Sequence, residues 1–280
     1  MESNAQLLDP ADAVDVAIRS GVSRRDALRQ AAMFSATLAA SPFALAALSS
    51  RAYGQTPEVL PQSIKDVLSF ALTLEHLEYE FYVAGVAAAD LIAEGETDVF
   101  TTIRNHEREH VIFLQNALAL TPGVGEGAAG RPEFGFDFTG APGGLALDTF
   151  TNYQTFLAVS QGLEDTGVRA YKGQAGEFVA SDALASNPLV SATLQAALQI
   201  HSVEGRHAAA VRLIRGQKGW ITGNDRGGLP AEFQGIYDGE DAAVSVSGYT
   251  AAQITEAFDE PLTKAQVLPI AGVFIRTSAP

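Results

Sequence analysis

One pattern that occurs twice along the chain restricts the fold more than any other feature. Each copy has a glutamate followed seven residues later by a tyrosine, and then a Glu-x-x-His motif further along the chain. The copies are Glu75, Tyr82, Glu107 and His110, and then Glu164, Tyr171, Glu204 and His207. Residues three or seven apart share one face of a helix. Chance predicts only about 0.3 Glu-x-x-His motifs in a chain of this composition. The repetition therefore indicates two similar helical hairpins.

Four long segments have helical patterns with helix signals at their ends. They span residues 63–94, 98–120, 148–179 and 188–215. Ser63 and Asn187 are expected N-terminal caps, and Gly95 and Pro122 mark expected ends. Short links after the first and third segments predict antiparallel hairpins. Residues 121–147, with eight glycines, then form one long crossover, which is typical of a ferritin-like four-helix bundle. We therefore predict an all-α fold.

The pattern divides the chain after residue 54 into two regions. We expect the bundle to span residues 55–219. A Gly-rich extension, residues 220–280, is expected to pack around the bundle with little regular structure beyond a short helix near residues 250–258 and at most a strand or two.

In residues 1–54 a charged segment, an apolar run and small residues follow one another in the order typical of an export signal. Ser23-Arg24-Arg25-Asp26-Ala27 precedes an apolar run from Ala31 to Leu48, and small residues follow at Ala52 and Gly54. The segment resembles a twin-arginine signal, although Ala27 stands where phenylalanine is common. A membrane anchor and an ordinary buried helix are the alternatives, but Pro42 interrupts the run. We expect export to the periplasm or the medium, and no stable membrane insertion once the signal is removed.

Composition excludes several classes of function. The net charge is −15 and no cluster of Lys or Arg stands out in the body of the chain, so nucleic acid is not an expected partner. The acidity suits cation handling but also simple solubility. There is no cysteine, and the only methionines are Met1 and Met33, within the expected signal. The exported chain would then lack the side chains that peroxide oxidises most readily, although chance also explains so few methionines.

The duplicated residues have the composition of a site for two metal ions. The candidate ligands are Glu75, Glu107, His110, Glu164, Glu204 and His207. Four carboxylates balance two divalent cations and can bridge them, and each histidine adds a nitrogen. Tyr82 and Tyr171 are expected to hydrogen-bond ligand carboxylates. The alternative is a buried hydrogen-bond network without metal.

The motifs also carry a family resemblance. Leu74–Tyr82 and Gly162–Gly167 resemble the ferritin-like, desiccation-related proteins of bacteria, and residues 60–216 are similar to the wider di-iron and di-manganese carboxylate group. The resemblance implies the same six ligands and two Mn or Fe ions. It also implies redox chemistry on peroxide or dioxygen, of the manganese-catalase or metal-oxidising kind.

Other residues and functions stay open at this point. Glu78, one turn from Glu75, is an extra ligand or a proton carrier. Surface or packing positions are expected for Glu80, Glu109, Asp165, His76, His106 and His201, the three carboxylates being solvated. The alternative function is a non-catalytic stress or desiccation-related protein that the metal pair stabilises. The chain could form a homo-oligomer. Iron storage in a hollow shell of many subunits is a third hypothesis for its function.

Overall fold

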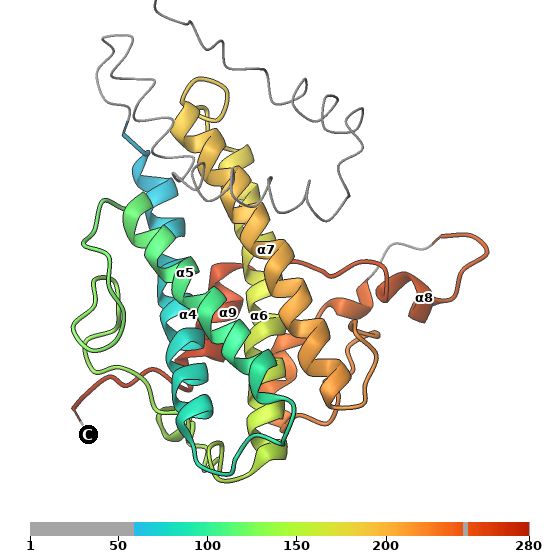
Figure 1. Cartoon of the computed structure of the whole chain (residues 1–280). Coiled ribbons are helices and arrows are strands. Elements are labelled where there is room, and N and C mark those ends of the chain that lie inside the picture. Colours follow the sequence, from blue (N-terminus) through green and yellow to red (C-terminus); the bar gives the residue numbers. More distant parts are fainter. Residues whose placement is uncertain (1–58, 243–245, 280) are drawn as a thin grey trace, which may run out of the picture.

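Four long helices form a bundle in the computed structural model, which describes residues 59–242 and 246–279 (Figure 1). The helices are α4 Gln62–Ala87, α5 Thr97–Ala117, α6 Tyr153–Val179 and α7 Pro188–Ile214. The most extensive contacts join α4 to α5 and α6 to α7, and α4 also packs on α6. The predicted all-α bundle of two hairpins with one long crossover is therefore confirmed. The expected signal, residues 1–54, lies outside the described part of the chain.

The helix ends differ most from the sequence-based prediction in α4 and α6. α4 begins one residue before Ser63, after Pro61, and it ends at Ala87 and not near residue 94. Residues 88–96 form turns in which Asp90 and Gly95 both have positive φ. α6 begins at Tyr153, because the side chain of Asn152 accepts hydrogen bonds from the first turn of backbone N–H groups. The connections from α4 to α5 and from α5 to α6 are thus longer than the sequence suggested.

The crossover between α5 and α6 is attached to the bundle by polar contacts. Arg131 forms an ion pair with Glu80 of α4, with 2.9 Å from Nη2 to Oε2, and its guanidinium lies 5.7 Å from the centre of the Phe136 ring. Gln115 of α5 donates to the carbonyl of Gly123 at 2.8 Å. The prediction that Glu80 is simply solvated is therefore wrong, because the crossover brings a cation over it.

Two apolar clusters fill the bundle at different levels. One contains stacked rings such as Phe81 and Phe156, whose centroids lie 5.0 Å apart, together with residues of the C-terminal extension. The other contains aliphatic residues such as Leu72 and Leu114. Along α5 and α7, the candidate ligands Glu107, His110, Glu204 and His207 lie between residues of the two clusters.

The C-terminal extension packs mainly on α6. Within the described residues it contains the short helices η2 Ala231–Ile236, η3 Glu240–Ala242 and α8 Ala251–Thr255, and a further helix, α9 Lys264–Gly272, that the sequence analysis missed. The expected strands do not form there beyond one isolated bridge between Phe136 and Ile275. No helix in the described part is long and apolar enough to cross a membrane.

One buried ion pair and one buried tyrosine hydroxyl hold this extension to the bundle. Arg169 of α6 is 1% exposed and lies 2.7 Å from Oε1 of Glu240. Asp165 of α6 accepts hydrogen bonds from Arg212 and, at 2.6 Å, from the hydroxyl of Tyr237. The prediction of a solvated Asp165 is wrong, because the extension covers the outer face of α6, which the helical pattern alone left exposed.

Candidate metal centre

Six side chains from all four helices of the bundle meet in its interior. They are Glu75 on α4, Glu107 and His110 on α5, Glu164 on α6, and Glu204 and His207 on α7. The most exposed of them, His110, is only 8% exposed. The fold thus brings together all six residues that the sequence suggested as ligands.

The donor atoms form two groups that share two carboxylates. One group is Glu75, Glu107, His110 and Glu204, and the other is Glu107, Glu164, Glu204 and His207. Within each group the donor atoms all lie within 4.8 Å of one another. Since Glu107 and Glu204 belong to both groups, the two groups enclose adjacent positions for metal ions. Each group adds one glutamate and one histidine that occupy corresponding places in the duplicated sequence pattern.

His110 turns one ring nitrogen toward three carboxylates. Its Nδ1 atom lies 3.1 Å from Oε2 of Glu75, 3.0 Å from Oε2 of Glu107 and 3.2 Å from Oε1 of Glu204. A single N–H cannot donate well to three acceptors in different directions. The four groups instead converge on a common point, as ligands of one cation do.

His207 has the corresponding position in the other group. Its Nδ1 atom lies 2.8 Å from Oε1 of Glu107 and 3.3 Å from Oε2 of Glu164. The geometry of these contacts leaves several buried atoms without a hydrogen-bond partner, namely His207 Nδ1, Glu107 Oε1, Glu164 Oε2 and both oxygens of Glu204. Each unsatisfied buried polar atom costs about 1–3 kcal/mol, so this cluster needs partners that the protein does not supply.

Two divalent cations fit this donor set. Donor atoms about 3 Å apart correspond to the edges of a coordination polyhedron with metal–ligand bonds of about 2.1 Å. Four carboxylates neutralise two such ions, and oxygen ligands with one imidazole per ion suit manganese and iron. The cluster can therefore hold a metal pair.

Protons take the place of cations when no metal is bound. Burial raises the pKa of Glu75 and of Glu164 to about 8. Burial alone would lower the pKa of His110 and His207, but the surrounding carboxylates outweigh it and raise both. At neutral pH the metal-free cluster thus holds two carboxylic acids and two imidazolium rings, and its charge nearly cancels.

A comparison with known families gives the same placement. The model of the ferritin-like domain family matches residues 63–217, which is more than half of the chain and includes all six candidate ligands. The chain belongs to the ferritin-like domain family. A search of curated proteins found no match to the chain. Membership of the desiccation-related subgroup stays a prediction.

Two tyrosines of the ferritin-like domain hydrogen-bond the outer carboxylates. The hydroxyl of Tyr82 donates to Glu164 and lies 2.6 Å from Oγ of Ser160, and the hydroxyl of Tyr171 donates to Glu75. Each tyrosine thus contacts the glutamate of the opposite helix, and not the one seven residues before it. Burial raises the pKa of both phenols well above the usual value, which keeps them as donors.

Glu78 lies beside the cluster but outside both donor groups. It is 3% exposed, and burial followed by the charge of Glu204 raises its pKa well above the usual value. Gly167 of α6 faces it: a Cβ atom there would lie 3.2 Å from both Glu78 Oε1 and Glu204 Oε2. Sequence reasoning did not single out Gly167, although a glycine inside a helix costs about 1 kcal/mol relative to alanine and is a signal of close packing.

The remaining histidines have different positions. His76 is buried and its Nε2 lies 3.2 Å from the carbonyl oxygen of Ala129, so it is a packing residue, one of the two expected positions, and lies under the crossover. His201 is partly buried, and Glu109 is exposed as expected. His106 is exposed, one of the two positions expected for it, but its Nδ1 also lies 2.9 Å from Nε2 of His207, a contact that the sequence did not predict.

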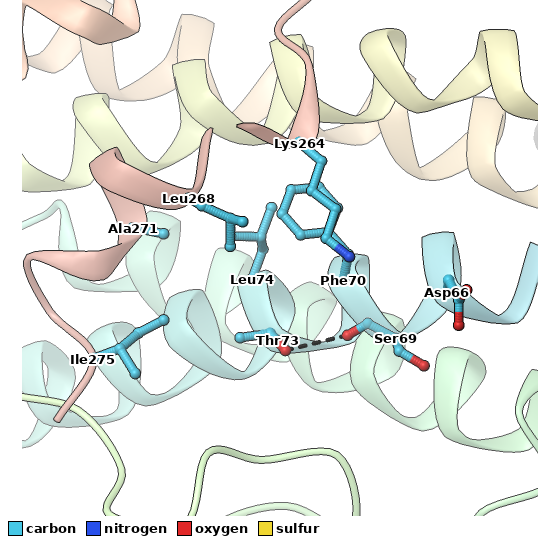
Figure 2. Close-up of a pocket in the computed structure, with 9 residues that line it drawn as sticks. All are labelled: Asp66, Ser69, Phe70, Thr73, Leu74, Lys264, Leu268, Ala271 and Ile275. Carbon is cyan, nitrogen blue, oxygen red and sulfur yellow. Dashed lines mark hydrogen bonds between the residues drawn. The ribbon is translucent and has the colours of Figure 1, made fainter. Parts of the chain in front are cut away.

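A surface groove of about 340 Å³ lies between α4 and α9, away from the metal centre (Figure 2). Its lining residues are Asp66, Ser69, Phe70, Thr73, Leu74, Lys264, Leu268, Ala271 and Ile275. None of the six candidate ligands lines it, and the ammonium of Lys264 lies over the ring of Phe70, 5.5 Å from its centre. The groove is therefore a feature of how the extension packs on α4, separate from the donor cluster.

Proposed function

We propose that the protein is an exported ferritin-like protein that binds two manganese or iron ions and uses them in redox chemistry on peroxide or dioxygen. The observation that carries this proposal is that Glu107 and Glu204 belong to both donor groups. Shared carboxylates hold two ions close enough to react as a pair with one small molecule.

The chain's residues then have distinct roles. Glu75 with His110, and Glu164 with His207, hold the outer sides of the pair, while Glu107 and Glu204 lie between the two positions. When bound, the metal pair supplies reversible changes of oxidation state. Tyr82 and Tyr171 orient the outer carboxylates, and Glu78, a buried carboxyl group whose pKa burial raises, lies near Glu204 in a position to hold a proton.

Composition supports chemistry with peroxide. No methionine follows Met33 and the chain has no cysteine, so the whole ferritin-like domain lacks readily oxidised sulfur. Export by the twin-arginine route would carry the protein already folded. Folding in the cytoplasm would also allow manganese, the weakest binder among the common divalent ions, to be loaded away from copper and zinc.

The second candidate function is a non-catalytic one, in which the metal pair only stabilises the bundle. The burial of the cluster favours it, because the six candidate ligands are all at most 8% exposed. A stress or desiccation-related protein would need no more access than this.

Metal analysis combined with a peroxide assay tests both proposals. We expect two Mn or Fe ions per chain in protein purified from its native compartment, and release of oxygen from hydrogen peroxide or oxidation of added ferrous ion. Glu204→Ala should lose both the stoichiometric metal and the activity, whereas Glu109→Ala, an exposed position on α5, should keep them. Fewer than two ions per chain would overturn metal-pair binding. Two ions without turnover would favour the stabilising role.

A further inference from the structure

The two histidines of the metal centre differ on the side that faces away from the carboxylates. Nε2 of His207 lies 2.9 Å from Nδ1 of His106. The two rings lie edge to edge and nearly in one plane, with centroids 5.2 Å apart and planes 14° from parallel, as an N–H···N hydrogen bond between two imidazoles requires. Among the described residues, Nε2 of His110 makes no hydrogen bond. The two halves of the centre are therefore unequal in the support given to their imidazoles.

The direction of the hydrogen bond follows from what His207 faces. Its Nδ1 atom is the nitrogen directed at Glu107 and Glu164, so a metal ion in that position needs the lone pair of Nδ1. A neutral imidazole carries its hydrogen on the other nitrogen, Nε2. That hydrogen points to Nδ1 of His106, which must then be the acceptor.

We propose that His106 is a positioning residue for the metal pair: its Nδ1 atom accepts the Nε2 hydrogen of His207 and so keeps the lone pair of His207 directed at Glu107 and Glu164. The inference rests on the proposed metal-binding function and assigns His106 a part in it. The hydrogen bond also restricts rotation of the His207 side chain. His106 is itself exposed. It lies on the solvent side of His207, between α5 and α7, and is not a candidate ligand.

An unequal effect on the two metal ions is the consequence. Groups that orient a histidine ligand typically change metal affinity by about 10–100-fold. His106 contacts only the half of the centre that contains His207. Its removal should therefore weaken binding of the ion in that half by about this factor, and it should leave the affinity for the ion held by Glu75 and His110 largely unchanged.

Three variants separate the hydrogen bond from the presence of a ring at this position. His106→Phe keeps an aromatic ring but removes the acceptor. His106→Asn removes the ring but places an amide oxygen on Cγ, where the histidine has Nδ1. His201→Phe is the matched control, since His201 lies on α7 one turn before Glu204 and contacts none of the six ligands through a hydrogen bond.

The experiment is a titration of each metal-free protein with Mn²⁺ in competition with a fluorescent chelator, which counts the ions and gives both affinities. ¹⁵N spectra of the histidines in the Zn²⁺-loaded protein report the tautomer of His207. We expect the unchanged protein to bind two ions and His106→Phe to bind one of them about 10–100-fold more weakly. His106→Asn should recover the affinity of the unchanged protein, and the control should not change it.

Two results would overturn the inference while leaving metal-pair binding intact. One is a His106→Phe protein that binds both ions as the unchanged protein does, with the Nε2–H tautomer preserved. The other is a His106→Asn protein as weak as His106→Phe. Failure of the unchanged protein to bind two ions would instead overturn the proposed function itself.

Discussion

Tyr171 on α6 donates its hydroxyl hydrogen to Glu75 on α4, a residue 96 positions earlier in the chain. The reciprocal bond runs from Tyr82 on α4 to Glu164 on α6. Each hairpin thus supports the outer carboxylate of the other hairpin. Neither half of the centre is complete without the opposite half, so the metal site and the packing of the two hairpins depend on each other.

Removal of one of these hydroxyls tests that dependence. In Tyr171→Phe the carboxylate of Glu75 loses its hydrogen-bond donor, so we expect the ion on the Glu75 side to bind about 10–100-fold more weakly. Tyr249→Phe is the control, since that ring is 64% exposed. Competition with a chelator measures both. Unchanged affinity in Tyr171→Phe would show that the hydroxyl has no part in orienting Glu75.

The glycine that faces the cluster gives a second prediction. Gly167→Ala places a methyl group 3.2 Å from Glu78 Oε1 and Glu204 Oε2, so both carboxylates must shift away from it by a few tenths of an ångström, and metal affinity should fall. Helix propensity alone would favour the alanine by about 1 kcal/mol. Gly176→Ala, on the same helix with no atom within 4 Å of the added Cβ, should show the gain in stability without the loss of metal. Thermal melts of the metal-free proteins and metal titration check both results. Equal metal binding in the two variants would contradict the prediction.

The pKa values of the cluster predict how metal-free protein responds to pH. The pKa of Glu75 and of Glu164 is raised from 4.5 to about 8, so the folded state binds more protons than the unfolded state between these values. The raised pKa values of His110 and His207 act in the same direction above 6.5. Stability of the metal-free protein should therefore fall as the pH rises from about 5 to about 9.

Metal binding should remove that trend. Two ions displace protons from two carboxyl groups and two imidazolium rings, so we expect release of up to about four protons per chain at pH 7. Thermal melts from acid to alkaline pH with and without Mn²⁺, together with proton release in weak buffer, measure this. A metal-free protein whose melting temperature is constant or rises over this range would contradict the assignment of protons.

The buried pair between Asp165 and Arg212 predicts a large effect on stability. Asp165→Asn leaves the guanidinium of Arg212 buried without its charge partner and weakens the acceptor of the Tyr237 hydroxyl. Breaking such a pair typically costs about 3–5 kcal/mol. Glu109→Gln breaks an exposed pair with Arg108 and should change stability by less than about 1 kcal/mol. Urea denaturation compares them. Equal midpoints would show that the Asp165–Arg212 pair between α6 and α7 stabilises the fold no more than an exposed pair does.

Local patterns along the chain were sufficient to predict much of this protein. The Glu-x-x-His spacing and the two Glu-to-Tyr spacings identified all six residues that converge, because residues three and seven apart share one face of a helix wherever the helix packs. Link lengths predicted the two hairpins and the long crossover, because a short connection forces neighbouring helices to run antiparallel.

Contacts between segments distant in sequence decided the rest. Helical spacing places Tyr82 on the face of Glu75, but only the packing of α4 against α6 gives it Glu164 as its partner. Asp165 is buried because the extension covers it, and His106 meets His207 because α5 and α7 lie side by side. Periodicity in one helix specifies which face is polar, whereas the partner of each polar group depends on which other helix or loop approaches that face.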